Sequence, residues 1–343
     1  MTTLHGLWIP LVTPFDADGG VAHGALERLA HDSLDAGATG LVALGSTGEP
    51  GALTEAEKHA VVATVARVCR ERSAPLIVGA ATAEALAALG EVPEATAALT
   101  VVPPFVRPGE AAVVAHFARL AAASPVPLVV YDIPYRTGQY LSVTALRQLA
   151  ALPNVAGVKY AVGGLNEDTI ALLAEPLPGF AVLGGDDAFI SPLLALGARG
   201  GILASAHLAT AQFAHLVTAW RDGYAVRARA LGHRLAPLSQ ALFAEPNPTV
   251  IKAALHAQGR IPTPRCARRC WRPTPTAPPP RSSSSPRSAA LPDPARGPSA
   301  LSKLPSRRCD DVTGASAWAA GGLRVSGCRA ATPGRGSARR PRP

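Results

Sequence analysis

The chain has 343 residues, of which 48% are hydrophobic and 17% charged, and its formal net charge is +9. Nearly half of the residues are apolar, which excludes a chain that is disordered throughout. No run of about 18 apolar residues is present, so we expect no membrane span. The first residues lack a basic start followed by an apolar stretch, and Cys69 is the only cysteine before position 265. We therefore expect a cytoplasmic protein rather than a secreted, disulfide-bonded one.

Short apolar runs rich in β-formers recur along the first 210 residues, each followed by an Ala/Leu-rich stretch of helical period. We predict strands at Gly6–Phe15, Gly40–Leu44, Pro75–Ala80, Leu99–Val102, Pro127–Asp132, Val155–Ala161, Phe180–Gly185 and Gly201–Ser205. Strands that alternate with helices indicate right-handed parallel βαβ units, and eight such units close into a (β/α)8 TIM barrel. A doubly wound open sheet is the alternative, but no G-x-G-x-x-G follows the first strand.

The helical stretches carry their own start signals. Thr54 with Glu57 three residues later predicts a capping box at the start of the helix after the second strand. Beyond Thr210 the periodicity predicts three further helices, at Gln212–Arg221, Val226–Phe243 and Thr249–Gln258. We therefore divide the chain into a barrel at 1–210, a helical extension at 211–264 and a tail at 265–343.

The tail has a different composition from the rest of the chain. Residues 265–343 hold 16 of the 33 Lys and Arg and 3 of the 24 Asp and Glu, a net charge of +13, whereas residues 1–264 carry −4. A sequence rich in Arg, Pro and Ser, with neither a helical nor a strand period, predicts a disordered segment. It has three interpretations: a flexible appendage, a basic arm for nucleic acid, or a GC-rich gene read out of frame. We favour the frameshift, and we do not expect nucleic-acid binding because no aromatic residues interleave with the basic ones.

In such barrels the catalytic groups lie at the C-terminal ends of the strands. The second strand ends in Gly45-Ser46-Thr47-Gly48-Glu49, the fifth in Tyr131-Asp132, the sixth in Lys159-Tyr160 and the seventh in Gly184-Gly185-Asp186-Asp187. These strand ends supply the candidate site residues.

Lys159 is the most informative of these residues. It lies in the otherwise apolar run NVAGVKYAV. A buried ammonium is costly, so such a lysine tends to become a neutral nucleophile that forms a Schiff base with a ketone. The alternative is a structural ion pair with Asp132 or Asp186.

Three further positions fit the same chemistry. The phenol of Tyr131 can transfer protons, and Ser46 and Thr47 in the Gly-flanked turn can bind a carboxylate. Arg136, in IPYRTG, can bind a second carboxylate through both guanidinium nitrogens. Taken singly, each also fits a structural role: a rim aromatic, an ordinary turn or a solvated arginine.

Several segments resemble one family. These are LVTPFDADG at 11–19, GSTGEPGALT at 45–54, VYDIPYRTG at 130–138, GVKYAVG at 157–163, LGGDD at 183–187 and NPTVIKAALHAQGRI at 247–261. In order and spacing they are similar to the dihydrodipicolinate synthase / N-acetylneuraminate lyase family of pyruvate-dependent barrel aldolases. The resemblance covers residues 4–264.

The resemblance implies roles for the candidate residues. Lys159 would form the Schiff base with pyruvate, Tyr131 would transfer protons with help from Ser46, and Ser46 and Thr47 would hold the pyruvate carboxylate. The carbonyl of Leu203 would orient the imine. Arg136 would bind aspartate semialdehyde, which favours the synthase branch of lysine and diaminopimelate biosynthesis. The family also implies a homodimer or homotetramer, with no cofactor and no metal.

Two residues depart from the family pattern. Phe105 stands where the family has a relay tyrosine contributed across the dimer, and Tyr160 stands where the synthase branch has a glutamate. These departures leave other functions open. One is an aldolase or dehydratase acting on 2-keto-3-deoxy sugar acids or N-acetylneuraminate, and another is a catalytically impaired relative that binds pyruvate. A metal-dependent aldolase is not expected, because the histidines and cysteines show no ligand spacing.

Overall fold

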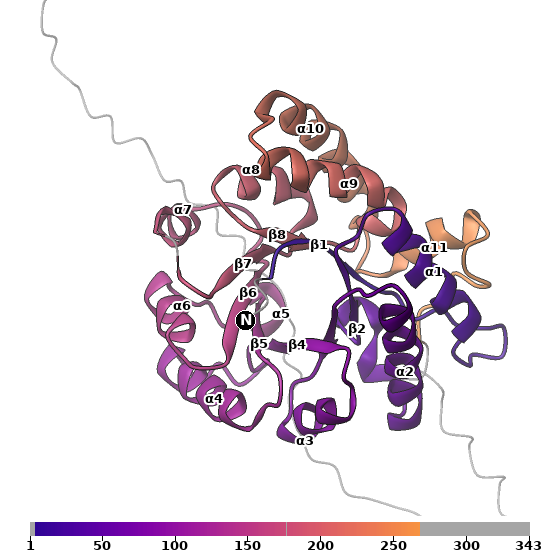
Figure 1. The fold of residues 1–343 in the computed structure, drawn as a ribbon, viewed down its shortest axis with the longest axis horizontal. Helices are drawn as coiled ribbons and strands as arrows, with labels where there is room; N and C mark the ends of the chain where they lie inside the picture. Colours follow the sequence, from indigo (N-terminus) through magenta and orange to yellow (C-terminus); the bar gives the residue numbers. More distant parts are fainter. Residues whose placement is uncertain (1–3, 176, 268–343) are drawn as a thin grey trace, which may run out of the picture. The chain divides into compact units, whose positions relative to one another are not determined.

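The structure, a computed structural model, describes residues 4–175 and 177–267. Eight parallel strands pair in chain order and close into a barrel, because β1 also pairs with β8 (Figure 1). The strands are β1 (Gly6–Pro10), β2 (Gly40–Ala43), β3 (Leu76–Gly79), β4 (Ala95–Val101), β5 (Leu128–Asp132), β6 (Val155–Tyr160), β7 (Ala181–Gly184) and β8 (Gly200–Ile202). The predicted (β/α)8 barrel is confirmed.

The helices lie on the outside of the barrel, except α5, which lies across its opening (Figure 1). They are α1 (His23–Asp35), α2 (Glu55–Glu71), α3 (Ala83–Ala87), α4 (Glu110–Ala123), α5 (Pro134–Thr137), α6 (Val143–Ala150), α7 (Glu167–Ala174), α8 (Ile190–Ala195), α9 (Ala206–Arg221), α10 (Ala225–Leu242) and α11 (Thr249–Ala257). Short 3-10 turns lie at η1 (Ser46–Gly48), η2 (Pro50–Ala52), η3 (Ala88–Glu91) and η4 (Asp187–Phe189). The capping box at Thr54 and Glu57 is present as predicted.

Three strands, β1, β4 and β8, differ from the prediction by more than one residue at a boundary. β1 ends at Pro10 instead of Phe15. Residues 11–15 are buried, as in a strand, but they form a loop that does not pair with the neighbouring strands. β4 begins at Ala95 instead of Leu99, and its first half is rich in alanine, which is a poor β-former. β8 spans Gly200–Ile202, so the chain leaves the sheet three residues earlier than expected.

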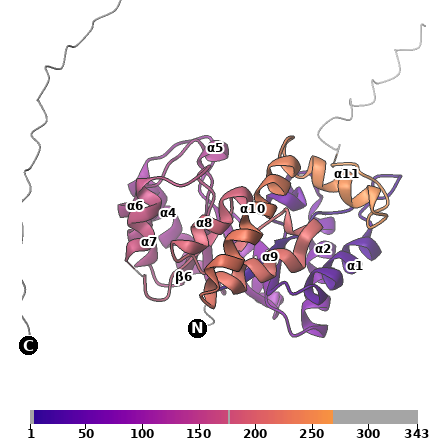
Figure 2. The same ribbon diagram turned by 90° about the horizontal axis from the view of Figure 1, so that it is seen from above.

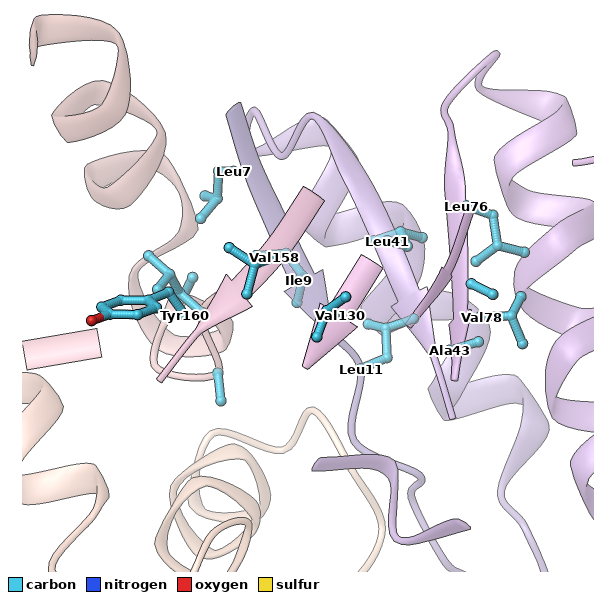
Figure 3. Close-up of a cluster of buried hydrophobic side chains, with 14 of the residues drawn as sticks. Leu7, Ile9, Leu11, Leu41, Ala43, Leu76, Val78, Val130, Val158 and Tyr160 are labelled. Atoms are coloured by element: carbon cyan, nitrogen blue, oxygen red, sulfur yellow. The ribbon is translucent and has the colours of Figure 1, made fainter. Parts of the chain in front are cut away.

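The apolar core has two layers, separated by the strands. The outer layer lies between strands and helices and includes Leu7, Ile9, Val130, Val158 and Tyr160 (Figure 3). The inner layer fills the barrel, and β5 contributes Val129 and Tyr131 to it. Since side chains alternate along a strand, this arrangement turns every second residue of β5 and β6 toward the interior.

Three helices follow β8 and form the extension. α9 packs against β1 and α8, α10 packs against α9 and η4, and α11 packs against α9. Figure 2 shows α11 at the same end of the barrel as α5, the short helix that directly follows β5. The extension therefore reaches the end of the barrel where the strands terminate.

No helix in the described part of the chain is long and apolar enough to cross a membrane. The tail, for which we predict disorder and no nucleic-acid binding, lies from residue 268 onward outside the described residues.

Candidate active site

A cavity of about 920 Å³ opens at the C-terminal ends of the strands. Its walls come from the residues after β2, β5, β6, β7 and β8 and from the end of α10 with the following loop. The residues that line the cavity include Thr47, Tyr131, Arg136, Lys159, Gly185, Asp186, Asp187, Ile202, Ala204, Ser239 and Asn247. The predicted residues Tyr131, Lys159, Thr47 and Arg136 thus share one cavity.

Lys159 is 5% exposed and lies in the cavity wall on β6. Its Nζ is 4.3 Å from the centroid of the Tyr131 ring. Tyr131 lies on β5 and is the residue paired with Lys159 in the sheet. No described carboxylate lies within ion-pair distance of Nζ, so the structure does not form the pair with Asp132 or Asp186 that was the alternative interpretation. A side chain at Gly185 would contact the Lys159 stem at 2.9 Å, which explains the glycine there.

Thr47 and Ser46 lie in the turn between β2 and α2 but occupy different environments. Thr47 is buried and lines the cavity, and its Oγ1 accepts a hydrogen bond of 2.9 Å from Asn247 Nδ2. Ser46 is half-buried and does not line the cavity. The structure therefore brings Thr47, and not Ser46, to the cavity wall.

Arg136 lies at the exposed rim of the cavity, on α5. Its Nε donates a 3.1 Å hydrogen bond to the Tyr135 hydroxyl, and its guanidinium stands 5.6 Å from the centroid of the Tyr135 ring. These contacts leave the remaining guanidinium nitrogens for an anion that enters the cavity.

Leu203 is fully buried in the outer layer of the core, and it is not among the cavity-lining residues. Its neighbours Ile202 and Ala204 line the cavity. The role expected of Leu203 belongs to its backbone carbonyl, so the burial of its side chain does not bear on it.

Two aspartates follow β7 and complete the wall beside Lys159. Burial raises the pKa of Asp187 to about 6, although the backbone N–H of Ser205 donates to its Oδ2. Burial also raises the pKa of Asp186, whose Oδ2 accepts a 2.7 Å hydrogen bond from the backbone N–H of Gly163. A carboxyl group with a pKa of about 6, such as that of Asp187, can exchange protons near neutral pH.

Asp132 lies outside the cavity although it directly follows Tyr131. It is fully buried, and neither of its carboxylate oxygens has a hydrogen-bond partner among the described residues. Burial, together with the charge of Asp186, raises its pKa to about 7. Alternation along β5 explains the placement, because it turns Tyr131 inward and Asp132 outward.

Sequence reasoning missed Asn247 and Ser239, which reach the cavity from the extension. Both lie in the cavity wall, and Asn247 Oδ1 and Ser239 Oγ are buried polar atoms without a partner in the described part of the chain. Asn247 lies within the motif NPTVIKAALHAQGRI, which supported the family resemblance but gave no indication of a place in the site. Within the described ranges no three His, Cys, Asp or Glu side chains come together as metal ligands.

Comparisons with known proteins agree with this geometry. Residues 3–274 match the model of the dihydrodipicolinate synthetase family. The chain is 38% identical over 256 residues to 4-hydroxy-tetrahydrodipicolinate synthase of Synechococcus elongatus, covering 73% of this chain and 85% of that protein. It is 37% identical over 263 residues to the enzyme of the same name from Syntrophus aciditrophicus, covering 75% and 89%.

Solved structures give the same result. The chloride-inhibited dihydrodipicolinate synthase from Acinetobacter baumannii, complexed with pyruvate, superposes with a TM-score of 0.72 at 32% identity. The superposition covers 76% of this chain and 90% of that one. A protein described as the first monomeric dihydrodipicolinate synthase variant superposes with a TM-score of 0.73 at 27% identity, covering 77% and 89%.

Proposed function

The chain belongs to the dihydrodipicolinate synthetase family and is a lyase, and from this membership we propose that it acts as a 4-hydroxy-tetrahydrodipicolinate synthase. In this proposal the protein condenses pyruvate with aspartate semialdehyde through a Schiff base. The observation that carries the proposal is a buried lysine in the cavity wall, Lys159, whose Nζ has no carboxylate of the described residues within ion-pair distance.

The first step is imine formation. The neutral amine of Lys159 attacks the keto carbon of pyruvate, and water leaves as the C=N bond forms. Lys159 lies in the cavity wall, so a keto acid that enters the cavity reaches its amine. The Tyr131 ring, 4.3 Å from Nζ, holds the amine on one side.

The pyruvate carboxylate binds at the turn after β2. Asn247 Nδ2 donates to Thr47 Oγ1, so the hydroxyl proton of Thr47 is left to donate elsewhere. In this proposal it donates to the carboxylate, and Ser46 assists from the same turn. The orienting carbonyl proposed at Leu203 lies in the segment that places Ile202 and Ala204 in the cavity wall.

The carbon–carbon bond forms from the enamine. During imine formation the Tyr131 phenol gives its proton to the hydroxyl that leaves as water. The phenolate then removes a proton from the methyl group of the imine, and the resulting enamine carbon attacks the aldehyde of the second substrate. Arg136 binds the carboxylate of that substrate at the rim of the cavity. The attack restores the iminium at Lys159, and the alkoxide formed from the aldehyde takes a proton from Tyr131. The amino group of aspartate semialdehyde then adds to the iminium carbon and passes its proton to Nζ, and the bond from that carbon to Nζ breaks, which releases the cyclic product and frees the amine.

An aldolase or dehydratase acting on sugar acids is the second candidate. Asp186 and Asp187 in the cavity wall favour it, because carboxylates accept hydrogen bonds from substrate hydroxyls. Phe105 favours the third candidate, an impaired relative that binds pyruvate, because a phenyl ring cannot transfer a proton. Screening aldehydes against the pyruvate-loaded protein separates the first two. For the third candidate, we expect pyruvate to raise the melting temperature of the protein while no aldehyde is converted to product.

The first test is trapping of the imine. The protein is incubated with pyruvate and borohydride, and peptide mass spectrometry locates the reduced adduct among its lysines, Lys58, Lys159, Lys252 and Lys303. We expect the adduct on Lys159, its loss in Lys159→Ala and its persistence in Lys58→Ala, whose lysine is paired with Glu55 on α2. A folded protein without an adduct on Lys159 would overturn the proposal.

A further inference from the structure

The turn between β2 and α2 is bounded by two residues in the left-handed region of backbone space. Leu44 has φ 54° and Glu49 has φ 55°, and neither is a glycine. Side chains disfavour this conformation, so such residues persist only where neighbouring contacts hold them. The turn that carries Thr47 is therefore held in place by the groups around it.

Two of these groups act on the turn itself. Thr13 Oγ1 donates a 2.7 Å hydrogen bond to the carbonyl of Gly48, and Asn247 Nδ2 donates to Thr47 Oγ1. Thr13 comes from the loop after β1 and Asn247 from the loop before α11. The turn is thus fixed from both sides by segments that are far apart in sequence.

Glu49 is held by a fully buried lysine. Lys252, on α11, has 0% exposure, and its Nζ donates to Glu49 Oε1 at 2.5 Å and to the Arg265 carbonyl at 3.0 Å. The Phe15 ring covers Nζ at 4.3 Å from the ring centroid. A buried ammonium requires such a set of partners, so Lys252 and Glu49 depend on each other.

The second oxygen of Glu49 binds the segment after α11. We call residues 261–267 the strap. The backbone N–H of Ala267 donates to Glu49 Oε2 at 2.6 Å. Further along, Thr263 Oγ1 donates to the Phe15 carbonyl and Arg265 Nη1 to the Ala17 carbonyl, each at 2.7 Å. The strap therefore crosses the loop after β1 and ends on Glu49.

We propose that Glu49 is a positioning residue for the keto-acid carboxylate, and that Lys252 and the strap residue Ala267 hold it in that role. This inference rests on the proposed function, in which Thr47 binds the pyruvate carboxylate. If Glu49 is released, its backbone leaves the left-handed region and the peptide groups from Thr47 to Glu49 rotate. The carboxylate site then loosens, whereas Tyr131 on β5 and Lys159 on β6 keep their places.

The variant that tests the proposal is Ala267→Pro. Proline has no N–H, so the hydrogen bond to Glu49 Oε2 is lost without any change of charge. Ala267→Ser keeps the N–H and is the matched control. Glu49→Gln is the second variant, because a neutral amide cannot accept hydrogen bonds from both Lys252 and Ala267 as the carboxylate does.

The measurement is borohydride trapping across a range of pyruvate concentrations. Loss of a hydrogen bond to a charged group predicts about a tenfold rise in the half-saturating pyruvate concentration for Ala267→Pro and Glu49→Gln. We expect the trapping rate at saturating pyruvate to stay that of the unmodified protein, and Ala267→Ser to give the unmodified half-saturation. A merely structural role would change the melting temperature without this split.

Two outcomes overturn the proposal, and they differ from a failure of the proposed function. Unchanged half-saturation in both variants shows that the strap does not position the turn. A fall in the saturating rate alone shows that the effect is on Lys159 or Tyr131. Where Ala267→Pro does not fold, Glu49→Gln decides by the same criterion. If the unmodified protein forms no adduct at all, the proposed function fails instead.

Discussion

At the scale of single residues, strand alternation and strand ends account for most of the site. Tyr131 and Lys159 are paired in register and face the interior, and Asp186 and Asp187 follow β7 in the cavity wall. These positions could be predicted, because a barrel places its functional groups at the C-terminal ends of strands. Asn247 could not, since its contact with Thr47 joins positions 200 residues apart and no local pattern encodes it.

Arg136 provides a prediction about the second substrate. Arg136→Ala removes the cation at the cavity rim, so KM for an aldehyde that carries a carboxylate is expected to rise about 100-fold. Trapping of the pyruvate adduct at Lys159 is expected to stay unchanged. Steady-state kinetics with Arg119→Ala as control, an exposed arginine on α4, checks this. Equal KM values in both variants would show that Arg136 does not bind the aldehyde.

Asp132 provides a prediction about pH. Burial raises its pKa to about 7 from an ordinary value of 3.8, so between these values the folded state keeps a proton that the unfolded state releases. This contribution to stability is present below about pH 4 and is lost as the pH rises through 7. The loss is at most about 4 kcal/mol for a shift of three units.

Asp132→Asn is expected to remove this part of the pH dependence. Denaturant unfolding at pH 5 and pH 8 measures it, and the decrease in unfolding free energy between them should be smaller in the variant. Asp187 and the buried His207, whose pKa burial lowers to about 4, are present in both proteins and cancel in the comparison. Asp16→Asn, at an exposed carboxyl, should keep the original decrease. Identical slopes for Asp132→Asn and the unmodified protein would contradict the assignment.

At the scale of elements, existence and order could be predicted better than length. The eight strands follow from the alternation of β-rich and Ala/Leu-rich runs. α9, however, begins at Ala206 and not at Gln212, because it contains a kink at Ala209, where φ is −147° and ψ is 45°. The kink interrupts the helical period, so the sequence pattern marks only the regular part that follows. β4 was shortened in the prediction for a related reason, since alanine favours helices over strands.

The capping box of α2 provides a prediction at this scale. Thr54 accepts from the backbone N–H of Glu57, and Glu57 Oε2 accepts from the backbone N–H of Thr54. Thr54→Ala is expected to lower the unfolding free energy by about 1 kcal/mol. Denaturant unfolding measures it, with Thr218→Ala on the exposed face of α9 as control. A loss no larger than in the control would mean that the cap does not stabilise α2.

At the scale of the whole molecule, two loops form an exposed apolar surface beside the cavity. Phe105 is 88% exposed, and Val106, Tyr135 and Tyr140 are also largely exposed. The backbone N–H of Phe105 donates to the Thr137 carbonyl at 3.2 Å, which joins the segments after β4 and β5 into one surface. An apolar surface of this kind favours contact with another protein, and we propose a second copy of this chain.

Phe105→Glu tests the association. A charge at the centre of the surface is expected to weaken self-association at least about 100-fold, because the loss of a central aromatic residue has an effect of this size at protein interfaces. Sedimentation velocity over a range of concentrations measures this, with Val226→Glu, at an exposed position on α10, as control. If the unmodified protein sediments as a monomer at every concentration, it resembles the monomeric synthase variant in this respect and the surface has another role.

The closure of the barrel has a consequence for how the protein comes to fold during synthesis. β1 closes on β8 through Gly6 and Gly200, where a Cβ on Gly200 would overlap the Gly6 backbone. The two strands are separated by almost the full length of the barrel sequence, and β8 has three residues. Contacts of such long sequence separation form late, because closing a long loop costs entropy before the contact forms. The ribosome must therefore release about 200 residues before the chain can close and hold Lys159, Tyr131 and Thr47 around one cavity.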